Sequence, residues 1–166
     1  MSSSDEDLPK SQFFYDYASE IFSLVFQGKN RLYNKIKDLT TITMALIPII
    51  LALCYYSLDN LQFNSLLLPI GLTLTCLCLA VLTGFYILWD NKFEYNDPLA
   101  LIEKYQSKSL SFITLKTASS LADVANINCE EHNKMGDRYQ YMIFFVGTGI
   151  IILLSTFWLA IINTIS

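Results

Sequence analysis

Three runs of apolar residues without a single charged side chain divide this chain, at residues 39–58, 66–89 and 141–162. Each run is close to or above the roughly 20 residues that a helix needs to cross a lipid bilayer. The pattern therefore predicts an all-α membrane protein with three transmembrane helices. Three buried helices of a soluble domain are the alternative, but a chain of 166 residues has too little polar surface to cover them.

The segment before the first run has the periodicity of an amphipathic helix. Its polar side chains share about a third of a helical wheel, and they are Gln12, Asp16, Ser19, Glu20, Ser23 and Gln27. We predict a disordered acidic tail over residues 1–10 and a cytoplasmic amphipathic helical region over 11–37, with a bend or break at Gly28. A lipid-binding face would carry Lys and Arg, so the acidic polar face favours packing against protein.

The last third of the chain predicts one long helix over residues 110–162 that continues from the cytoplasm into the third span. It forms most of a cytoplasmic helical region over residues 97–140, which begins with a short helix capped by Asp97 and Pro98. An apolar seam follows one side of the long helix and contains Leu110, Ile113, Leu121, Val124, Met135, Tyr139 and Met142.

Thr117, Asn128 and His132 interrupt this seam with polar side chains. A polar residue in a helical seam costs stability but can determine the register and the number of associating helices, which is one interpretation of Asn128. The second interpretation is that the three residues line a ligand pocket between helices. The third is simple exposure to solvent. His132 is also a candidate pH-responsive residue, because imidazoles change charge near neutral pH.

Catalytic and metal-binding signatures are not found in the sequence. It contains no GxSxG, HExxH or P-loop pattern, so we predict no enzymatic activity and no cofactor. Cys129 and His132 are three residues apart on one helix face, but a structural zinc site uses four ligands and the chain has one histidine, so we predict no metal site.

The distribution of charge predicts how the chain is inserted. The 11 basic residues precede the first span or lie between the second and third, namely Lys10, Lys29, Arg31, Lys35, Lys37, Lys92, Lys104, Lys108, Lys116, Lys134 and Arg138. By the positive-inside rule, the N-terminus is cytoplasmic and the C-terminus lies outside the cell membrane. Lys29, Arg31, Lys35 and Lys37 form a predicted basic collar before the first span. The net charge of −4 argues against a nucleic-acid partner.

The layout resembles the small membrane effectors of nucleotide-signalling antiviral defence, the Pycsar transmembrane effectors and the SLATT effectors. It combines an N-terminal helix, a two-span hairpin, a helical insert and a long helix that enters a third span, and residues 118–141 (ASSLADVANINCEEHNKMGDRYQY) are the most similar part. The resemblance implies sensing of a cyclic nucleotide second messenger, oligomerisation and membrane impairment, and it transfers no individual binding residue.

Three functions follow as hypotheses. The first is a non-enzymatic, self-associating membrane effector or sensor that couples a cytoplasmic helical bundle to the spans. The second is an accessory subunit whose apolar faces bind another membrane protein. The third is a small oligomeric channel lined by threonines such as Thr73, Thr75 and Thr83. The expected partners are the lipid bilayer and either further copies of this chain or a different membrane protein.

Overall fold

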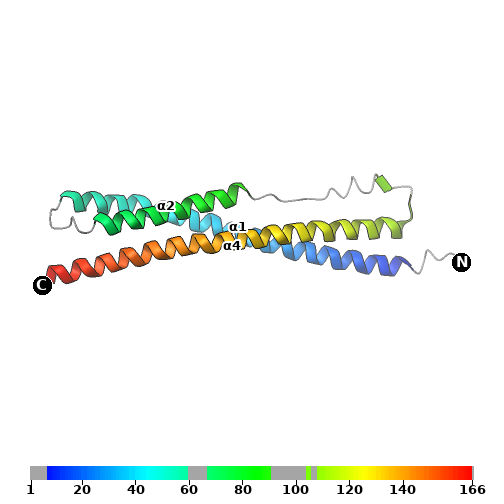
Figure 1. The fold of residues 1–166 in the computed structure, drawn as a ribbon. Coiled ribbons are helices and arrows are strands. Elements are labelled where there is room, and N and C mark those ends of the chain that lie inside the picture. The colour runs from blue at the N-terminus through cyan, green and yellow to red at the C-terminus, as the bar shows by residue number, and fades with distance from the viewer. Residues whose placement is uncertain (1–6, 60–66, 91–103, 106–107, 166) are drawn as a thin grey trace. The chain divides into compact units, whose positions relative to one another are not determined.

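The computed structural model describes residues 7–59, 67–90, 104–105 and 108–165, and all of the regular structure in these ranges is helical. The helices are α1 (Asp7–Asp59), α2 (Leu67–Trp89) and α4 (Leu110–Ile165) (Figure 1). The predicted all-α fold is therefore confirmed for the described residues. All three helices are long and apolar enough to cross a membrane, judged by length and composition.

Helix α1 differs from its prediction in two respects. It begins at Asp7, so the prediction of a disordered tail is wrong for residues 7–10, while residues 1–6 lie outside the described ranges. It also continues through Gly28 and Pro48, so the predicted break at Gly28 is wrong and the regions 11–37 and 39–58 belong to one helix. A glycine in a helix costs only about 1 kcal/mol, which the packing of its neighbours can outweigh.

Helix α4 confirms the prediction of a single long helix that begins at Leu110, and it continues three residues beyond the predicted end at Ile162. Ser109 accepts two hydrogen bonds from the first turn of this helix, one at the hydroxyl from the amide of Phe112 and one at the carbonyl oxygen from the amide of Ile113. The short helix predicted after Pro98 lies mostly outside the described residues, apart from a helical turn at Lys104 and Tyr105.

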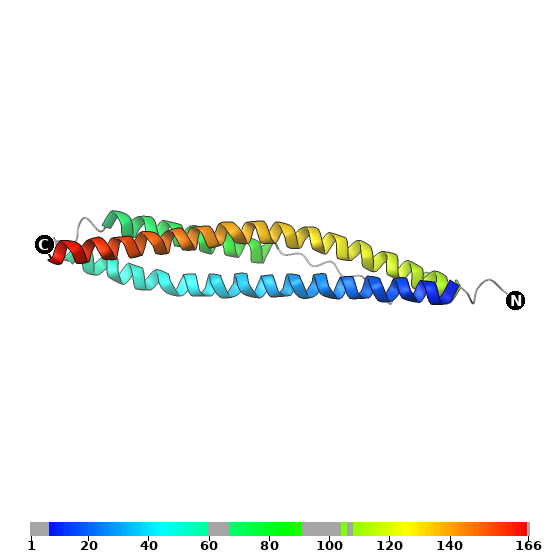
Figure 2. The same ribbon diagram turned by 90° about the horizontal axis from the view of Figure 1, so that it is seen from below.

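The described residues form two compact units. Unit 1 contains α1 up to Leu32 and α4 up to Lys134, and unit 2 contains α1 from Tyr33, α2, and α4 from Met135. Within unit 1, α1 and α4 lie side by side and run in the same direction (Figures 1 and 2). Within unit 2, α2 runs antiparallel to both other helices.

Unit 2 is a three-helix packing around an apolar core. Ile50 of α1 and Ile70 and Leu77 of α2 form its buried centre, and Leu153 of α4 packs against them. Gly84 lets the helices approach closely, because a Cβ atom there would collide with the Thr40 side chain and lie 3.2 Å from Cε of Met142. Many outward-facing side chains of unit 2 are large and apolar, among them Ile42, Leu72 and Leu154, as expected of helices that face lipid.

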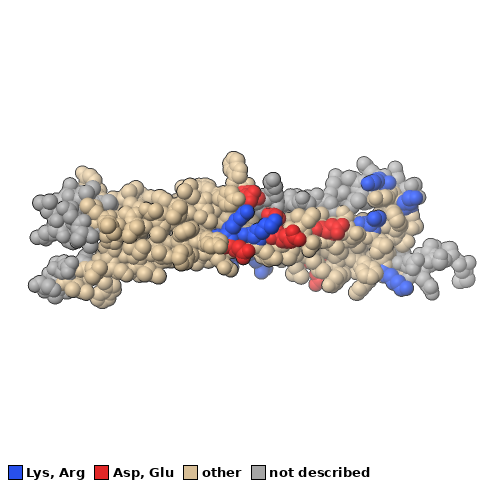
Figure 3. All heavy atoms as spheres, in the orientation of Figure 1, with Lys and Arg blue, Asp and Glu red and all other residues tan. Residues whose placement is uncertain are grey.

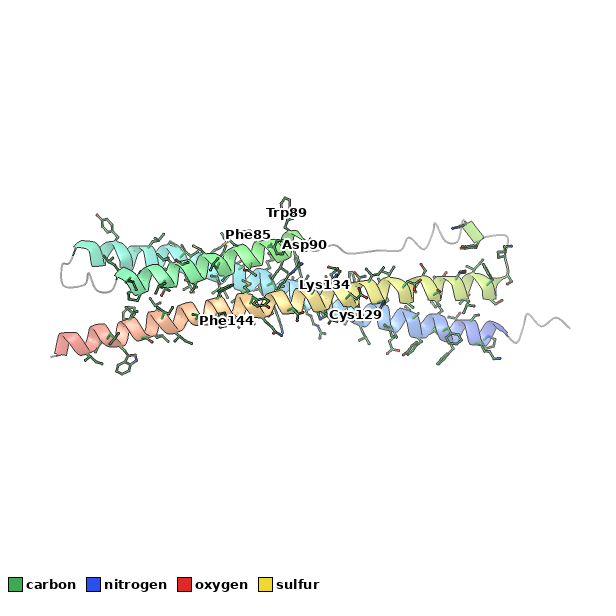
Figure 4. All side chains as sticks on the ribbon, in the orientation of Figure 1. Phe85, Trp89, Asp90, Cys129, Lys134 and Phe144 are labelled. Carbon is green, nitrogen blue, oxygen red and sulfur yellow. The ribbon has the colours of Figure 1, made fainter. Side chains whose placement is uncertain are left out.

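At the charged end of unit 2, a side chain of α4 contacts the end of α2. Arg138 of α4 donates a hydrogen bond of 2.6 Å to Asp90, the residue that follows α2, and its guanidinium lies 4.8 Å from the centre of the Tyr86 ring. The neighbouring Trp89 projects away from α2 and is 93% exposed (Figure 4). An exposed tryptophan at the end of an apolar helix is typical of the interface between membrane and water.

The threonines proposed to line a channel do not share one face of α2. Thr73 is buried inside unit 2, whereas Thr75 is exposed. The hydroxyls of Thr73, Thr75 and Thr83 each donate to a carbonyl of their own helix four residues earlier. This arrangement gives the channel hypothesis no common polar surface in the described part of α2.

Candidate functional site: a buried polar cluster beside an apolar groove

Lys29 of α1 is completely buried in unit 1, with 0% of its surface exposed. Its ammonium donates a hydrogen bond of 3.3 Å to the side-chain oxygen of Asn128 on α4. The prediction that Lys29 belongs to a basic collar is therefore wrong, although Arg31, Lys35 and Lys37 are exposed as expected. A buried charge is costly unless it is paired or hydrogen-bonded, so this contact constrains how the two helices meet.

The position of Lys29 along α1 explains its burial. It follows the buried Ala18 by eleven residues and precedes the buried Ile36 by seven, spacings that place all three on one side of a helix. In unit 1, this is the side of α1 that faces α4. The spacing was visible in the sequence, but the chemistry of a lysine indicated solvent instead.

Asn128 occupies the centre of the α4 seam, as predicted, and is 1% exposed. Its neighbours Val124 and Ala125 are also buried. A polar contact in an otherwise apolar helical pair favours one register over others, because a shift of the helices would break it. Its hydrogen bond to Lys29 is consistent with the register interpretation, and a ligand-binding role for Asn128 stays a prediction.

His132 lies one turn after Asn128 and next to Gly28. A Cβ atom placed on Gly28 would lie 3.8 Å from Cε1 of the imidazole, so the glycine leaves room for the ring. The Nδ1 atom of His132 is buried and has no hydrogen-bond partner among the described residues. An unpaired buried polar atom normally costs stability or has a functional explanation.

Thr117 does not belong to this cluster. It is half-buried three turns before Asn128, and its hydroxyl donates to the carbonyl oxygen of Ile113 at 2.9 Å. The structure thus brings Asn128 and His132 together and adds Lys29, a residue of the predicted basic collar.

Cys129 and His132, the pair considered as a metal half-site, both lie on α4 and are half-buried. Among the residues that the structure describes, no group of three or more His, Cys, Asp or Glu side chains could hold a metal ion. Figure 4 shows Cys129 on the same helix as Lys134, whose ammonium forms an ion pair of 2.8 Å with Glu131.

An apolar groove lies beside the cluster, between α1 and α4 of unit 1, with a volume of about 690 Å³. Small side chains create it, because Ala18, Ala118 and Ala125 at the helix contact leave space that larger residues would fill. The groove is lined by Phe14, Tyr17, Ala18, Ile21 and Val25 of α1 and by residues of α4 from Phe112 to Cys129. Lys116 is the cation that lines it.

Comparisons with protein-family models, with curated proteins and with solved structures found no match to this chain. What the site can do therefore follows from its own residues. The cluster offers one ammonium, one amide and one imidazole nitrogen, which suits it to hold two helices in register or to bind a polar ligand. The groove offers an apolar surface of the size that a helix or a small molecule occupies.

Proposed function

We propose that this chain is a non-enzymatic, multi-pass protein of the cell membrane that self-associates and acts as an effector or sensor. The observation that carries the proposal is the continuity of α1 and α4, which both run without a break from unit 1 into unit 2. A change in the packing of these helices in unit 1 has no intervening loop in which to be absorbed. Continuous helices are therefore suited to couple a cytoplasmic event to the spans.

The proposed topology has three crossings with the N-terminus and unit 1 in the cytoplasm and the C-terminus outside. Two features support it. The basic residues lie before the first span or between the second and third, and none lies in residues 59–65 or after Ile162. On α4, Arg138 is the last charged residue, and none follows it up to Ile165. In the face that Figure 3 shows, the described atoms toward the C-terminal end of α4 belong to uncharged residues.

The topology is tested by placing a glycan acceptor or a reporter enzyme between residues 60 and 65. We expect the reporter to be modified or active only on the outer side of the membrane. Reporter activity in the cytoplasm would mean that the orientation is the reverse of the proposed one and that unit 1 does not lie in the cytoplasm. A second reporter after Ser166 should behave like the first.

Self-association is tested by chemical cross-linking of the full chain in native membranes, followed by identification of the products. A ladder made only of this chain supports the effector or sensor. A mixed product with a second protein supports the alternative function, an accessory subunit of a larger membrane complex, which the exposed groove also favours. Cross-linked products that contain no second copy would refute self-association.

A cyclic nucleotide second messenger is the ligand class that we propose for unit 1, from the similarity of the layout to the effectors of nucleotide signalling. Purified protein in lipid nanodiscs would be titrated with cyclic nucleotides while hydrogen exchange in residues 14–32 and 112–134 is followed. We expect protection to rise around Asn128 and His132. Unchanged exchange with the whole panel would refute this choice of ligand and leave the topology intact.

A further inference from the structure

We infer that the groove of unit 1 binds α1 of a second copy of this chain, so that two unit 1 helix pairs form a parallel four-helix arrangement. The inference rests on the proposed function, because two copies in one membrane must have the same orientation. They are then related by a two-fold axis along the membrane normal. Each copy therefore binds α1 of the other copy in its own groove. Three observations support the inference: an apolar stripe on α1, the register of α1 and α4, and the charged residues found at matching levels of the two helices.

The first observation is an apolar stripe on α1 at the edge of the groove, with Tyr17 belonging to both the stripe and the groove lining. Phe13, Tyr17 and Leu24 are 67%, 57% and 62% exposed, although they are large apolar or aromatic side chains. Their spacings of four and seven residues place them on one side of the helix. Amphipathic helices that bind in grooves present anchors at such spacings. Unit 1 thus carries both a groove and a stripe of the kind that fills one.

The second observation is the register of α1 and α4, which run in parallel within unit 1 (Figures 1 and 2). The hydrogen bond between Lys29 and Asn128, together with the approach of the His132 ring to Gly28, places these stretches of α1 and α4 at the same level to within about one helical turn. Thirteen residues before this pair, Asp16 is level with Leu115, the neighbour of Lys116. Two residues after it, Arg31 is level with Glu130. Because a two-fold axis parallel to the helices preserves height, the second copy's α1 has the same levels.

The third observation is the charge at those levels. Lys116 lines the groove on α4, and Glu130 lies fourteen residues later, close to four turns, on the same side. On α1, Asp16 borders the apolar stripe and Arg31 continues it seven residues after Leu24. All four charged residues are exposed within one copy. When a second copy binds, Lys116 meets Asp16 and Glu130 meets Arg31, so opposite charges face each other at both ends of the groove.

The intermediate level is compatible with this arrangement. Asp123 of α4 is five residues before Asn128 and is therefore level with Leu24, five residues before Lys29. Asp123 faces this uncharged position, and Glu20, an exposed carboxylate of α1 beside the stripe, lies about one turn before it. The two-fold symmetry repeats each opposite-charge contact, which gives four such pairs around the two grooves.

The test is charge reversal in the full chain, with self-association measured by energy transfer between labelled copies in liposomes. We expect Lys116→Glu and Asp16→Lys each to weaken association by roughly fivefold, since each places like charges together at two symmetric positions. The double variant Lys116→Glu/Asp16→Lys should recover wild-type association. Lys108→Glu, an exposed charge outside the groove lining, is the matched control and should have no effect.

A substitution that fills the groove gives a second, independent readout. Ala122 lines the groove and is exposed, so Ala122→Trp should abolish association while leaving the contact of Lys29 with Asn128 in place. Hydrogen exchange at residues 120–134 verifies that the helix pair is still formed. Association that persists in this variant, or a double charge variant that stays as weak as the single ones, would overturn the interface. A wild-type chain that remains monomeric would refute the proposed self-association as well.

Discussion

Replacing Asn128 with leucine should destabilise the contact between α1 and α4 in unit 1, although leucine is the better residue for an apolar seam. The reason is Lys29, whose completely buried ammonium uses the Asn128 side chain as a hydrogen-bond acceptor. A hydrogen bond to a charged group contributes about 1.5 to 3 kcal/mol. Loss of about 2 kcal/mol would raise the population of locally opened unit 1 roughly 30-fold.

The double variant Lys29→Met/Asn128→Leu separates this explanation from a simple size effect. Methionine has a length similar to that of lysine without its charge, so the pair becomes apolar and neither of the two positions keeps a polar group that has lost this hydrogen bond. Replacing a buried polar pair by apolar residues of similar volume is often neutral or stabilising. We therefore expect the double variant to match or exceed the wild-type protein, and Lys29→Met alone to lose about 1 to 3 kcal/mol, because Asn128 loses its hydrogen bond with the ammonium.

Hydrogen exchange of the full chain in lipid nanodiscs measures these differences locally. Peptides covering residues 20–32 and 120–134 should exchange faster in Asn128→Leu and return to wild-type rates in the double variant. Lys35→Met and Asn133→Leu change the same residue types at exposed positions and should leave the rates unchanged. Slower exchange in Asn128→Leu, or a double variant as unstable as the single one, would refute the role assigned to the buried pair.

Three further predictions concern single side chains. Gly84→Ala should lower the thermal stability of the detergent-solubilised protein by about 1 to 3 kcal/mol, because the added methyl group meets Thr40 and Met142, whereas Gly71→Ala has open space and should be neutral or stabilising. His132→Leu should leave thermal stability unchanged or raise it, because it removes a buried nitrogen that has no partner among the described residues. Arg138→Gln should cost at most about 1 kcal/mol in the same assay, since its ion pair with Asp90 is partly exposed.

Each of these outcomes has a clear opposite. Equal melting temperatures for Gly84→Ala and Gly71→Ala would mean that the packing around Thr40 can accommodate an added methyl group without loss of stability. A large destabilisation by His132→Leu would assign the imidazole a structural hydrogen bond. A loss of several kcal/mol in Arg138→Gln would mean that the contact with Asp90 and the Tyr86 ring is more shielded from solvent than its exposure indicates.

Much of the helical architecture could be predicted from the sequence. A run such as residues 141–162 can be recognised as a candidate membrane span from its own residues, because each apolar residue adds to the preference for a nonpolar environment independently of the fold. The continuity of α4 from Leu110 was equally readable, since no proline or glycine pair interrupts its periodicity before Gly147. The central place of Asn128 in the seam also followed from periodicity alone.

The predictions for α1 that concern Gly28 and Lys29 are wrong for a physical reason. Glycine lowers helix propensity, so the sequence predicts a bend or break at Gly28, whereas in the structure Gly28 leaves room for the imidazole of His132. Propensity is a local preference of about 1 kcal/mol, and tertiary contacts of the surrounding helix are worth more. The same contacts explain why Lys29 is buried between the helices, although its charge predicts a solvated position in the basic collar.

The order of residues along the chain is enough to establish where this protein is apolar enough to cross a bilayer and which residues follow one side of each helix, because both properties are local. The contact of Lys29 with Asn128, the fit of His132 beside Gly28 and the groove next to the alanines become visible when the helices are packed together. Such contacts join residues about a hundred positions apart. Their pairing depends on the direction and register in which two helices pack, and neither quantity is encoded in the periodicity of one helix alone.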